Sequence, residues 1–325
     1  MFFQTEAGSS SKISSARSLF FLKHTLLTVS FPMTLYLPDI PVAERQYYLQ
    51  HVVAPRPICF AATVDKQGTV NLSPFSFFNL FSANPPVVIF SPSRRVRDNT
   101  TKHTLQNILE VPEVTINIVT WDMVQQTSLA SCEYPKGTDE FVKAGFSKKS
   151  ATIVKPPLVK ESKVSMECMV KEVKSLGEEG GAGQLVICEI VYLHINDELL
   201  SPDKKFDQRK LELAARLGGD WYAKISAGNL FTVEKPNLKN GIGIDALPAN
   251  LRNSTVLSGN DLGRLANVPV MPSADILFKD EKVNAILLND QRQEGIRHLH
   301  SYIKELLKQG NVALAWQVAL LTENC

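Results

Sequence analysis

The chain has 325 residues, 44% of them hydrophobic and 21% charged, which is a composition typical of a globular protein with a large apolar core. A formal net charge of +2 excludes a global electrostatic attraction to nucleic acid or to a membrane surface. No apolar run reaches the roughly 18–20 residues that a membrane helix needs.

The cysteines and histidines do not suggest a metal centre. The five cysteines are scattered, and no pair has the Cys-x-x-Cys spacing of a zinc site or a redox dithiol. An odd and sparse count fits a reducing compartment, so we expect a cytoplasmic protein. His298 and His300 lie two residues apart on a predicted helix and therefore point to different faces, which is poor geometry for a shared metal.

The first 32 residues differ from the rest of the chain. They are rich in serine and basic, and the run Leu19-Phe-Phe-Leu22 resembles the apolar part of a targeting peptide. Lys23 and His24 interrupt that run, and no small-x-small cleavage site follows. We interpret residues 1–32 as a disordered or mis-started tail, with Met33 as the true start. The main domain is expected over residues 33–235, and residues 236–325 form an extension of a loop and then helices.

Short elements are predicted in the first half of the domain. Residues 42–50 favour a short helix, and residues 58–72 a hairpin with Gly68 in its turn. The apolar run 87–90 is expected to be a strand that is buried on both faces. A helix is predicted from Asn99 to Leu109, with Asn99 or Thr100 as its N-cap.

The second half continues with hairpins and then changes to helices. Alternation predicts a strand over 114–119 and a long hairpin, 164–173 with 184–194, around the glycine-rich turn 178–183. The remaining segments are predicted as helices: 121–130, 141–144, 206–217, a helix capped by Ser258 or Asn260, 293–308 and 311–321. Gly218 and Gly219 would end the helix 206–217. Because hairpins dominate and regular β-α-β alternation is absent, we expect a mainly β fold, an antiparallel barrel with flanking helices.

One stretch, residues 71–101, combines the side chains that a small-molecule pocket needs. Its first part places the polar residues Asn71, Ser73, Ser76 and Asn79 among phenylalanines such as Phe77, which suits the edge and face of a planar polar ring. Taken alone, this part is better explained by a strand-to-helix corner with capping serines and core phenylalanines.

The end of that stretch is cationic. Arg94, Arg95 and Arg97 precede a predicted helix, together with hydroxyl groups and Lys102. Guanidinium groups, hydroxyls and free N–H groups at a helix start are donors that suit a phosphate. The alternative interpretation is a solvated basic turn, and the preceding hydroxyl-rich segment favours the phosphate.

The chain shows no nucleophile or acid–base pair at recognisable spacing. It has neither Gly-x-Ser-x-Gly nor His-Glu-x-x-His. Cys132 has no partner histidine nearby in the sequence. The turn 178–183 lacks the Gly-Lys-Ser/Thr of a phosphate-binding loop and is interpreted as a hairpin turn.

Several blocks of this sequence resemble the flavin reductase-like family. They are Arg56-Pro-Ile-Cys-Phe-Ala-Ala-Thr-Val-Asp-Lys-Gln-Gly68, Asn71-Leu-Ser-Pro-Phe-Ser-Phe-Phe-Asn79, Asn84-Pro-Pro-Val-Val-Ile-Phe90 and Arg94-Arg-Val-Arg-Asp-Asn-Thr100. Two further blocks, Ser128 to Gly137 and Gly181 to Glu189, resemble the flavoredoxin-like branch of the family. The resemblance covers about residues 40–265. It implies an FMN-binding split barrel of Greek-key type, and a homodimer with the flavin near the subunit interface.

The resemblance also implies roles for individual residues. Asn71 and Phe77 match the family's ring-contacting asparagine and aromatic residue, and Tyr222, beside Trp221, matches a late aromatic residue near the ring. The hydroxyl and basic residues after the next strand match Ser91, Arg97, Asn99 and Thr100. Together with Ser73 and Ser76, these residues are the expected FMN-binding set.

The activity expected from the resemblance is an FMN-dependent NAD(P)H oxidoreductase that passes hydride through bound FMN to an acceptor. A non-catalytic FMN-binding electron carrier is the alternative, and a barrel that has lost flavin and works as a binding module is a third reading. A redox partner protein fits the first two. In each flavin reading the cofactor carries the chemistry and the protein binds and orients it.

Overall fold

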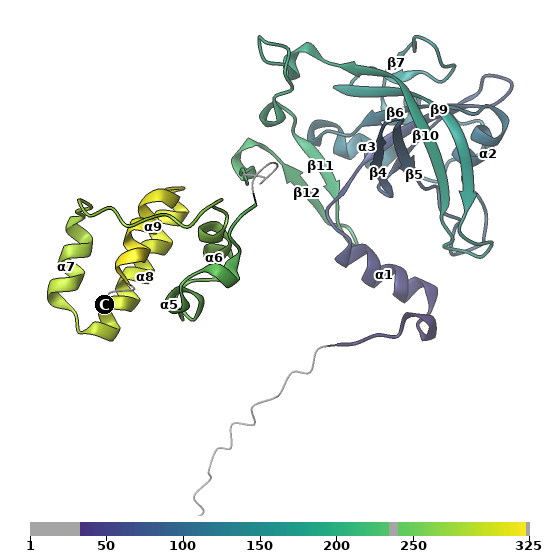
Figure 1. Cartoon of the computed structure of the whole chain (residues 1–325). Coiled ribbons are helices and arrows are strands. Elements are labelled where there is room, and N and C mark those ends of the chain that lie inside the picture. The colour runs from purple at the N-terminus through teal and green to yellow at the C-terminus, as the bar shows by residue number, and fades with distance from the viewer. Residues whose placement is uncertain (1–32, 234–239, 323–325) are drawn as a thin grey trace, which may run out of the picture. The chain divides into compact units, whose positions relative to one another are not determined.

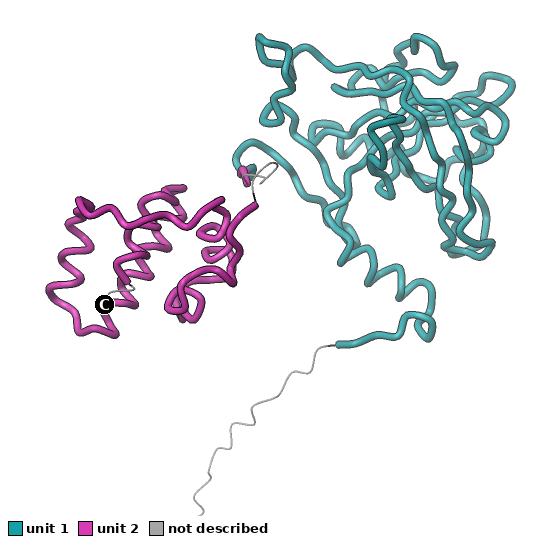
Figure 2. Tube along the Cα trace, in the orientation of Figure 1, with its two compact units in different colours: residues 1–230 teal, residues 231–325 magenta. Residues whose placement is uncertain are grey.

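The computed structural model describes residues 33–233 and 240–322, so the expectations for residues 1–32 lie outside the described residues. The chain divides into two compact units at residues 230 and 231, which Figure 2 shows in different colours. In the described residues, no helix has the length and apolar character needed to cross a membrane.

The first unit is built on a seven-stranded antiparallel sheet, and Figure 1 labels its strands β4, β5, β6, β9 and β10. In spatial order its strands are β3 (Val70–Phe75), β2 (Cys59–Val64), β6 (Glu113–Ile118), β9 (Val164–Ser175), β10 (Gln184–Ile195), β5 (Pro86–Phe90) and β4 (Phe78–Ala83). Strands β2 to β5 follow one another along the chain, and β6 returns to pair with β2, as in a Greek key. Among the described residues no ladder joins β3 to β4, so the barrel is open at this seam.

Strand β2 is buried on both faces and organises the core of this unit. Its side chains alternate between two apolar clusters, as the period of two in a strand requires. Phe60 packs in the cluster that contains Phe141, while Cys59 and Ala61 pack in the cluster that contains Ile108. The first cluster includes residues of α3 (Val124–Ala130) and α4 (Glu140–Ala144), and the second includes residues of α2 (His103–Glu110).

Smaller elements complete the unit. A three-stranded sheet joins β1 (Arg56–Pro57), β11 (Leu213–Arg216) and β12 (Tyr222–Ile225), and β7 (Lys148–Lys149) pairs with β8 (Leu158–Val159). Helix α1 (Val42–Val52) has no buried residue. The short 3-10 helices are Leu37–Asp39, Trp121–Met123, Asp197–Leu199, Gln208–Lys210 and Ala227–Asn229.

The predicted helix over residues 206–217 is wrong. Residues Leu213–Arg216 form β11, in which Arg216 lies opposite Tyr222 of β12. Ala214 is 1% exposed and packs in the same core cluster as Phe60. Alanine, leucine and arginine favour a helix in isolation, but pairing with strands on both sides overrides that local preference. Gly218 and Gly219 serve the hairpin turn, where Gly219 has a φ of +55°.

Two further predictions need correction. Strand β5 is not buried on both faces, because Val88 and Phe90 are buried whereas Val87 and Ile89 are only half-buried. Helix α2 begins at His103 after an N-cap at Lys102, whose side chain makes no capping bond, so neither Asn99 nor Thr100 caps it. The reason is local: Asn99 has a φ of +57°, which is incompatible with a helix start four residues earlier.

The second unit is helical and has its own apolar core. Its elements are the 3-10 helix Ile244–Ala246, α5 (Ala249–Arg252), α6 (Gly259–Ala266), α7 (Glu281–Asn289), α8 (Arg292–Lys308) and α9 (Val312–Leu321). Ser258 caps α6 in a reciprocal capping box with Asp261. Leu299 and Ile303 of α8 are fully buried, and the indole N–H of Trp316 donates to the Leu265 carbonyl over 3.0 Å. The amphipathic pattern over 293–308 therefore predicted α8 well.

A buried carboxylate fastens the loop before β8 to the main sheet. Glu167 of β9 has no exposed surface, and it accepts backbone N–H bonds from Thr152 over 2.6 Å and Ile153 over 2.8 Å. His194 of β10 lies 2.7 Å away through its Nε2 atom. Burial opposes ionisation, but these backbone donors and the histidine outweigh it and lower the pKa of Glu167 to about 2.

Replacing this carboxylate is expected to give a pH-dependent loss of stability. Because the pKa of Glu167 is lower in the folded chain than in the unfolded one, the stabilisation is present above the ordinary glutamate pKa and is lost as the pH falls towards 2. Glu167→Gln should therefore lower the free energy of unfolding by about 2–3 kcal/mol at neutral pH. Urea unfolding at several pH values should show this difference shrinking below about pH 5. A difference that does not change with pH would contradict the assignment.

The core of the second unit can be tested with a matched pair of leucines. Leu299→Ala removes a side chain that is 0% exposed and should cost about 2–5 kcal/mol, whereas Leu288→Ala alters one that is 85% exposed and should change stability by less than about 0.5 kcal/mol. Denaturant unfolding followed by circular dichroism measures both. Equal effects of the two substitutions would show that α8 does not supply the core.

Candidate functional site

A large cavity lies in the first unit, with a volume of about 1020 Å³. Its walls come from α1, the corner between β3 and β4, the loop that follows β5, and the turn between β9 and β10. This size is ample for a small-molecule ligand. The cavity brings together four of the predicted site residues: Ser76, Phe77, Ser91 and Arg97.

One part of the cavity wall is aromatic and hydroxyl-bearing. Phe75 and Phe77 flank Ser76 at the β3–β4 corner, and the Arg56 guanidinium lies 5.9 Å from the centre of the Phe77 ring. Ser91, at the end of β5, accepts a hydrogen bond from the Gln184 backbone N–H over 3.0 Å. These groups offer an apolar surface with hydroxyls at its edge.

The loop that follows β5 forms the cationic part of the wall. Arg94 fixes the loop conformation, because its Nε atom donates to the Asn99 side-chain oxygen over 2.6 Å and its Nη2 atom to the Asn99 carbonyl over 2.7 Å. Asn99 is therefore engaged within the loop and does not line the cavity. The same loop carries three residues that do line the cavity, Arg95, Arg97 and Lys102.

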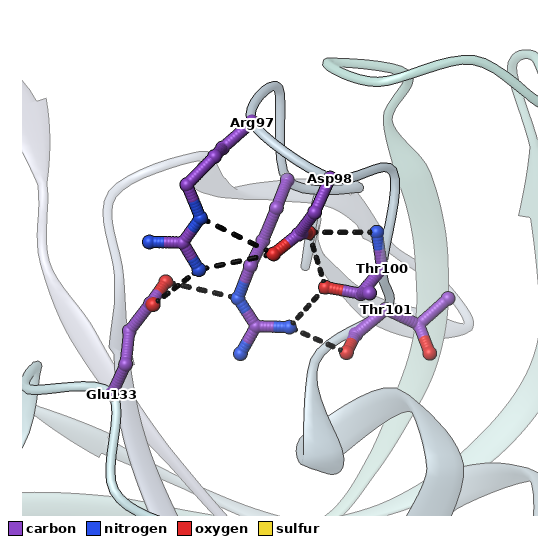
Figure 3. Close-up of polar contacts among 6 residues, drawn as sticks. Arg97, Asp98, Thr100, Thr101 and Glu133 are labelled. Atoms are coloured by element: carbon purple, nitrogen blue, oxygen red, sulfur yellow. Dashed lines mark hydrogen bonds and ion pairs between the residues drawn. The ribbon is translucent and has the colours of Figure 1, made fainter.

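Arg95 and Arg97 share one acidic partner, Glu133, as part of the cluster that Figure 3 shows. Glu133 accepts from Arg95 Nε over 2.9 Å and from Arg97 Nη2 over 2.9 Å. Arg95 also donates from Nη1 to Thr100 Oγ1 over 2.8 Å. Thr100 therefore supports Arg95 and does not itself line the cavity. Hydrogen bonds from the two arginines lower the pKa of Glu133. Hydrogen bonds to Glu133 and Asp98 raise the pKa of Arg97.

Lys102 is a cation without a close acidic partner. Among the described residues its ammonium group makes no ion pair within 4.0 Å. Burial and the nearby Arg95 charge lower its pKa. The same two causes, with Lys136 and Lys102 itself, lower the pKa of His103, the first residue of α2. Burial is the larger cause of both shifts, and the neighbouring cations add to it.

The turn between β9 and β10 packs directly on the cationic loop. Arg94 N–H donates to the Ala182 carbonyl over 2.9 Å, and Gly181 N–H donates back to the Arg94 carbonyl over 3.0 Å. A Cβ atom at Gly180 would lie 3.0 Å from the Arg95 carbonyl oxygen, so any other residue there would require the loop to shift by a few tenths of an ångström. The sequence correctly indicated a hairpin turn here, but its part in the cavity wall was missed.

Three buried polar atoms in the cavity wall lack a protein partner. They are Arg45 Nε, Arg56 Nε and Ser93 Oγ, and all three residues line the cavity. Buried donors without partners are uncommon in folded proteins and carry a desolvation cost. Arg45 comes from α1, a helix for which the sequence pattern offered no functional signal. Three residues of the wall therefore retain hydrogen-bonding capacity that the protein itself does not use.

The remaining predicted residues lie elsewhere. Asn71 is buried, donates to Glu140 Oε1 over 2.9 Å and accepts from Thr104 Oγ1 over 2.7 Å, so its amide joins β3 to α4 and α2. Ser73 lies on β3 opposite Ala61, outside the cavity wall. Tyr222 also lies outside it, and the Arg216 guanidinium lies 4.5 Å from the centre of its ring.

Chemically, the cavity is a binding site more than a reactive one. Its acidic lining residues, Glu133, Glu178 and Glu179, do not form a carboxylate pair with a histidine or a nucleophile. The described residues contain no group of three histidine, cysteine or acidic side chains that could hold a metal ion. The arrangement suits a ligand that brings its own reactivity, with an acceptor-rich, anionic end.

Comparison with known proteins gives a consistent result. Residues 52–211 match the model of the flavin reductase like domain. An uncharacterised protein from Aquifex aeolicus is 34% identical over 173 residues, which is 53% of this chain and 86% of that protein.

Solved structures show the same architecture. Nitrilotriacetate monooxygenase component B from Bacillus cereus superposes with a TM-score of 0.58 at 26% identity, over 63% of this chain and 100% of that one. A Shewanella frigidimarina protein described as a flavin reductase with a split barrel domain superposes with a TM-score of 0.53 at 25% identity, over 61% and 96%. The open antiparallel sheet with flanking helices is therefore a split barrel, as predicted.

Proposed function

The chain belongs to the flavin reductase-like family, and from this premise we propose that it binds FMN in the 1020 Å³ cavity and works as an NAD(P)H-dependent oxidoreductase. Hydride from NADH or NADPH would pass through the flavin to an acceptor. The use of NADH or NADPH as the donor, the transfer to an acceptor and the involvement of any redox partner protein are all parts of this proposal.

The cavity wall is the observation that supports FMN. It joins an aromatic part, a group of serine hydroxyls and a cationic loop, and it contains three buried polar atoms without a protein partner. FMN has matching parts in one molecule: a planar ring, a hydroxylated chain and a phosphate. The residues present therefore fit the group.

The geometry suggests which residues would hold each part. Arg95, Arg97 and Lys102 would bind the phosphate, because they line the cavity and, unlike Arg94, are not bound to Asn99 within the loop. Ser76, Ser91 and Ser93 would bind the hydroxylated chain, and Phe75 and Phe77 would pack against the ring. Asn99 and Thr100 would act through the loop, by orienting Arg94 and Arg95.

Bound FMN supplies the electron and hydride chemistry in proteins that use it. The residues of this chain would bind it, orient its ring and exclude water from it. Asn71, Ser73 and Tyr222 lie outside the cavity wall, so their contribution to FMN binding would have to be indirect.

An exposed edge strand supports the proposal of a homodimer or a protein partner. Strand β4 ends the main sheet, and Leu80 and Phe81 on it are 62% and 63% exposed. An edge strand with large exposed apolar side chains is suited to association. The same surface, three and four residues beyond the cavity-lining Phe77, favours an electron carrier as the second candidate function, because a partner protein could approach the flavin there.

Anaerobic reduction separates the two functions. The purified protein with FMN should be yellow, and NADH or NADPH alone should bleach its flavin band. Reduction that requires a partner protein would support the carrier instead. A protein that stays colourless after FMN is added, by absorbance and by calorimetry, would exclude both.

Phosphate placement can be tested with two arginines of unequal exposure. The Arg95 side chain is 17% exposed and that of Arg97 71% exposed. Arg95→Ala should weaken FMN binding by about 1–3 kcal/mol, and Arg97→Ala by less, because a more buried charge-assisted contact is worth more. The control is Arg209→Ala, at an arginine paired with Asp207 outside the cavity. Isothermal titration measures all three. FMN affinity unchanged in both loop variants would refute the placement.

A further inference from the structure

The cationic loop already holds an anion from another part of the chain. The Glu133 carboxylate bridges Arg95 Nε and Arg97 Nη2, at 2.9 Å from each, and Glu133 itself lines the cavity (Figure 3). Two oxygens that accept from two guanidinium groups are what a phosphate would also present there. Glu133 thus occupies the acceptor position next to both arginines.

Asp98 touches the same loop in a different way. It accepts from Arg97, but it also accepts from Thr100 Oγ1 over 2.6 Å and from Thr100 N–H over 3.1 Å. These contacts to Thr100 span two residues and lower the pKa of Asp98 to about 2, so its carboxylate is part of the fold of the loop.

Glu133 has no such role in the loop that it contacts. It comes from the segment between α3 and α4, more than thirty residues away in the sequence. Backbone hydrogen bonds next to it stay within that segment, such as Tyr134 N–H to the Cys132 carbonyl over 2.9 Å. Its side chain is 45% exposed, so it can rotate into solvent without breaking a strand or a helix.

We propose that Glu133 is an internal counter-ion that competes with the ligand's phosphate for Arg95 and Arg97 and is displaced when the ligand binds. The identification of that ligand as FMN rests on the proposed function. The competition itself rests only on the two ion pairs and on the exposure of the carboxylate.

The consequence is a cost in affinity that falls on a ligand with a phosphate. A phosphate monoester carries nearly two negative charges and three acceptor oxygens, so it can replace both ion pairs of Glu133. An uncharged flavin such as riboflavin cannot replace them and leaves Glu133 where it is. Glu133 therefore lowers the affinity for a phosphorylated ligand and narrows its advantage over an uncharged flavin.

The test compares Glu133→Gln with Glu178→Gln. Both substitutions remove one negative charge from the cavity wall, but only Glu133 pairs with the arginines. Glu133→Gln should tighten FMN binding about three- to tenfold, the size expected for exposed ion pairs, and leave riboflavin binding unchanged. Glu178→Gln should change FMN binding less than twofold. Inorganic phosphate, titrated by NMR, should also bind more tightly to Glu133→Gln than to the wild type.

The outcomes separate this inference from the proposed function. Weaker or equal FMN and phosphate binding by Glu133→Gln would overturn the inference, because it would show that the carboxylate orients the arginines or does nothing. Flavin binding by the wild type would then still support the function. Tighter phosphate binding without any flavin binding would uphold the competition and overturn the function. Equal gains in Glu178→Gln would reduce the effect to net charge and overturn the specific role of Glu133.

Discussion

The cavity depends on one backbone contact, the packing of the β9–β10 turn against the loop after β5. Arg94 exchanges two backbone hydrogen bonds with Gly181 and Ala182. Gly180, which has no Cβ atom, allows the two segments of the chain to lie in close contact. This contact fixes the loop while leaving Arg95 and Arg97 directed away from the core. Without it, four cationic side chains on an irregular segment would repel one another and take many conformations. The long hairpin therefore acts as a support for the site as well as part of the sheet.

The charge of the cavity wall explains its internal contacts. Six cationic residues and three acidic ones line it, so the wall has a surplus of positive charge. Burial and neighbouring cations lower the pKa values of Lys102 and His103, whereas the Arg95–Glu133–Arg97 bridge compensates part of the surplus locally. A site built for an anion must be stable before the anion arrives, and a movable carboxylate meets that requirement at the expense of some affinity.

The sequence predicted the elements with clear periodicity and missed what depends on distant pairing. The hairpins β2–β3 and β9–β10 and the helix α8 follow their patterns, and the family blocks identified the split barrel. Residues 213–216 were mistaken for a helix because they become a strand only through pairing with β1, which lies far earlier in the sequence, and with β12, which follows them. Of the residues expected to bind FMN, four line the cavity: Ser76, Phe77, Ser91 and Arg97. Asn71 does not line the cavity. Side chains of a strand point alternately to its two faces, and a single sequence does not reveal that Glu140 lies on the inner face and binds Asn71. Arg45 and Gly180 have functional positions that only the folded chain reveals.

The contrast between Asn71 and Arg95 shows how the two kinds of polar residue differ in this unit. The Asn71 amide is hydrogen-bonded to Glu140 and Thr104 within the protein, so its role is structural. Arg45, Arg56 and Ser93 each retain a buried atom without a partner, and Arg95 and Arg97 share an acceptor that can leave. Native folds contain only a few such unsatisfied atoms, because each one carries a desolvation cost. Three of the four buried side-chain atoms without a partner in the described residues belong to residues that line one cavity, as does the exchangeable carboxylate, whereas the fourth, His300 Nε2, lies in the second unit. This grouping is the physical reason to assign binding to the cavity and structure to the network around Asn71.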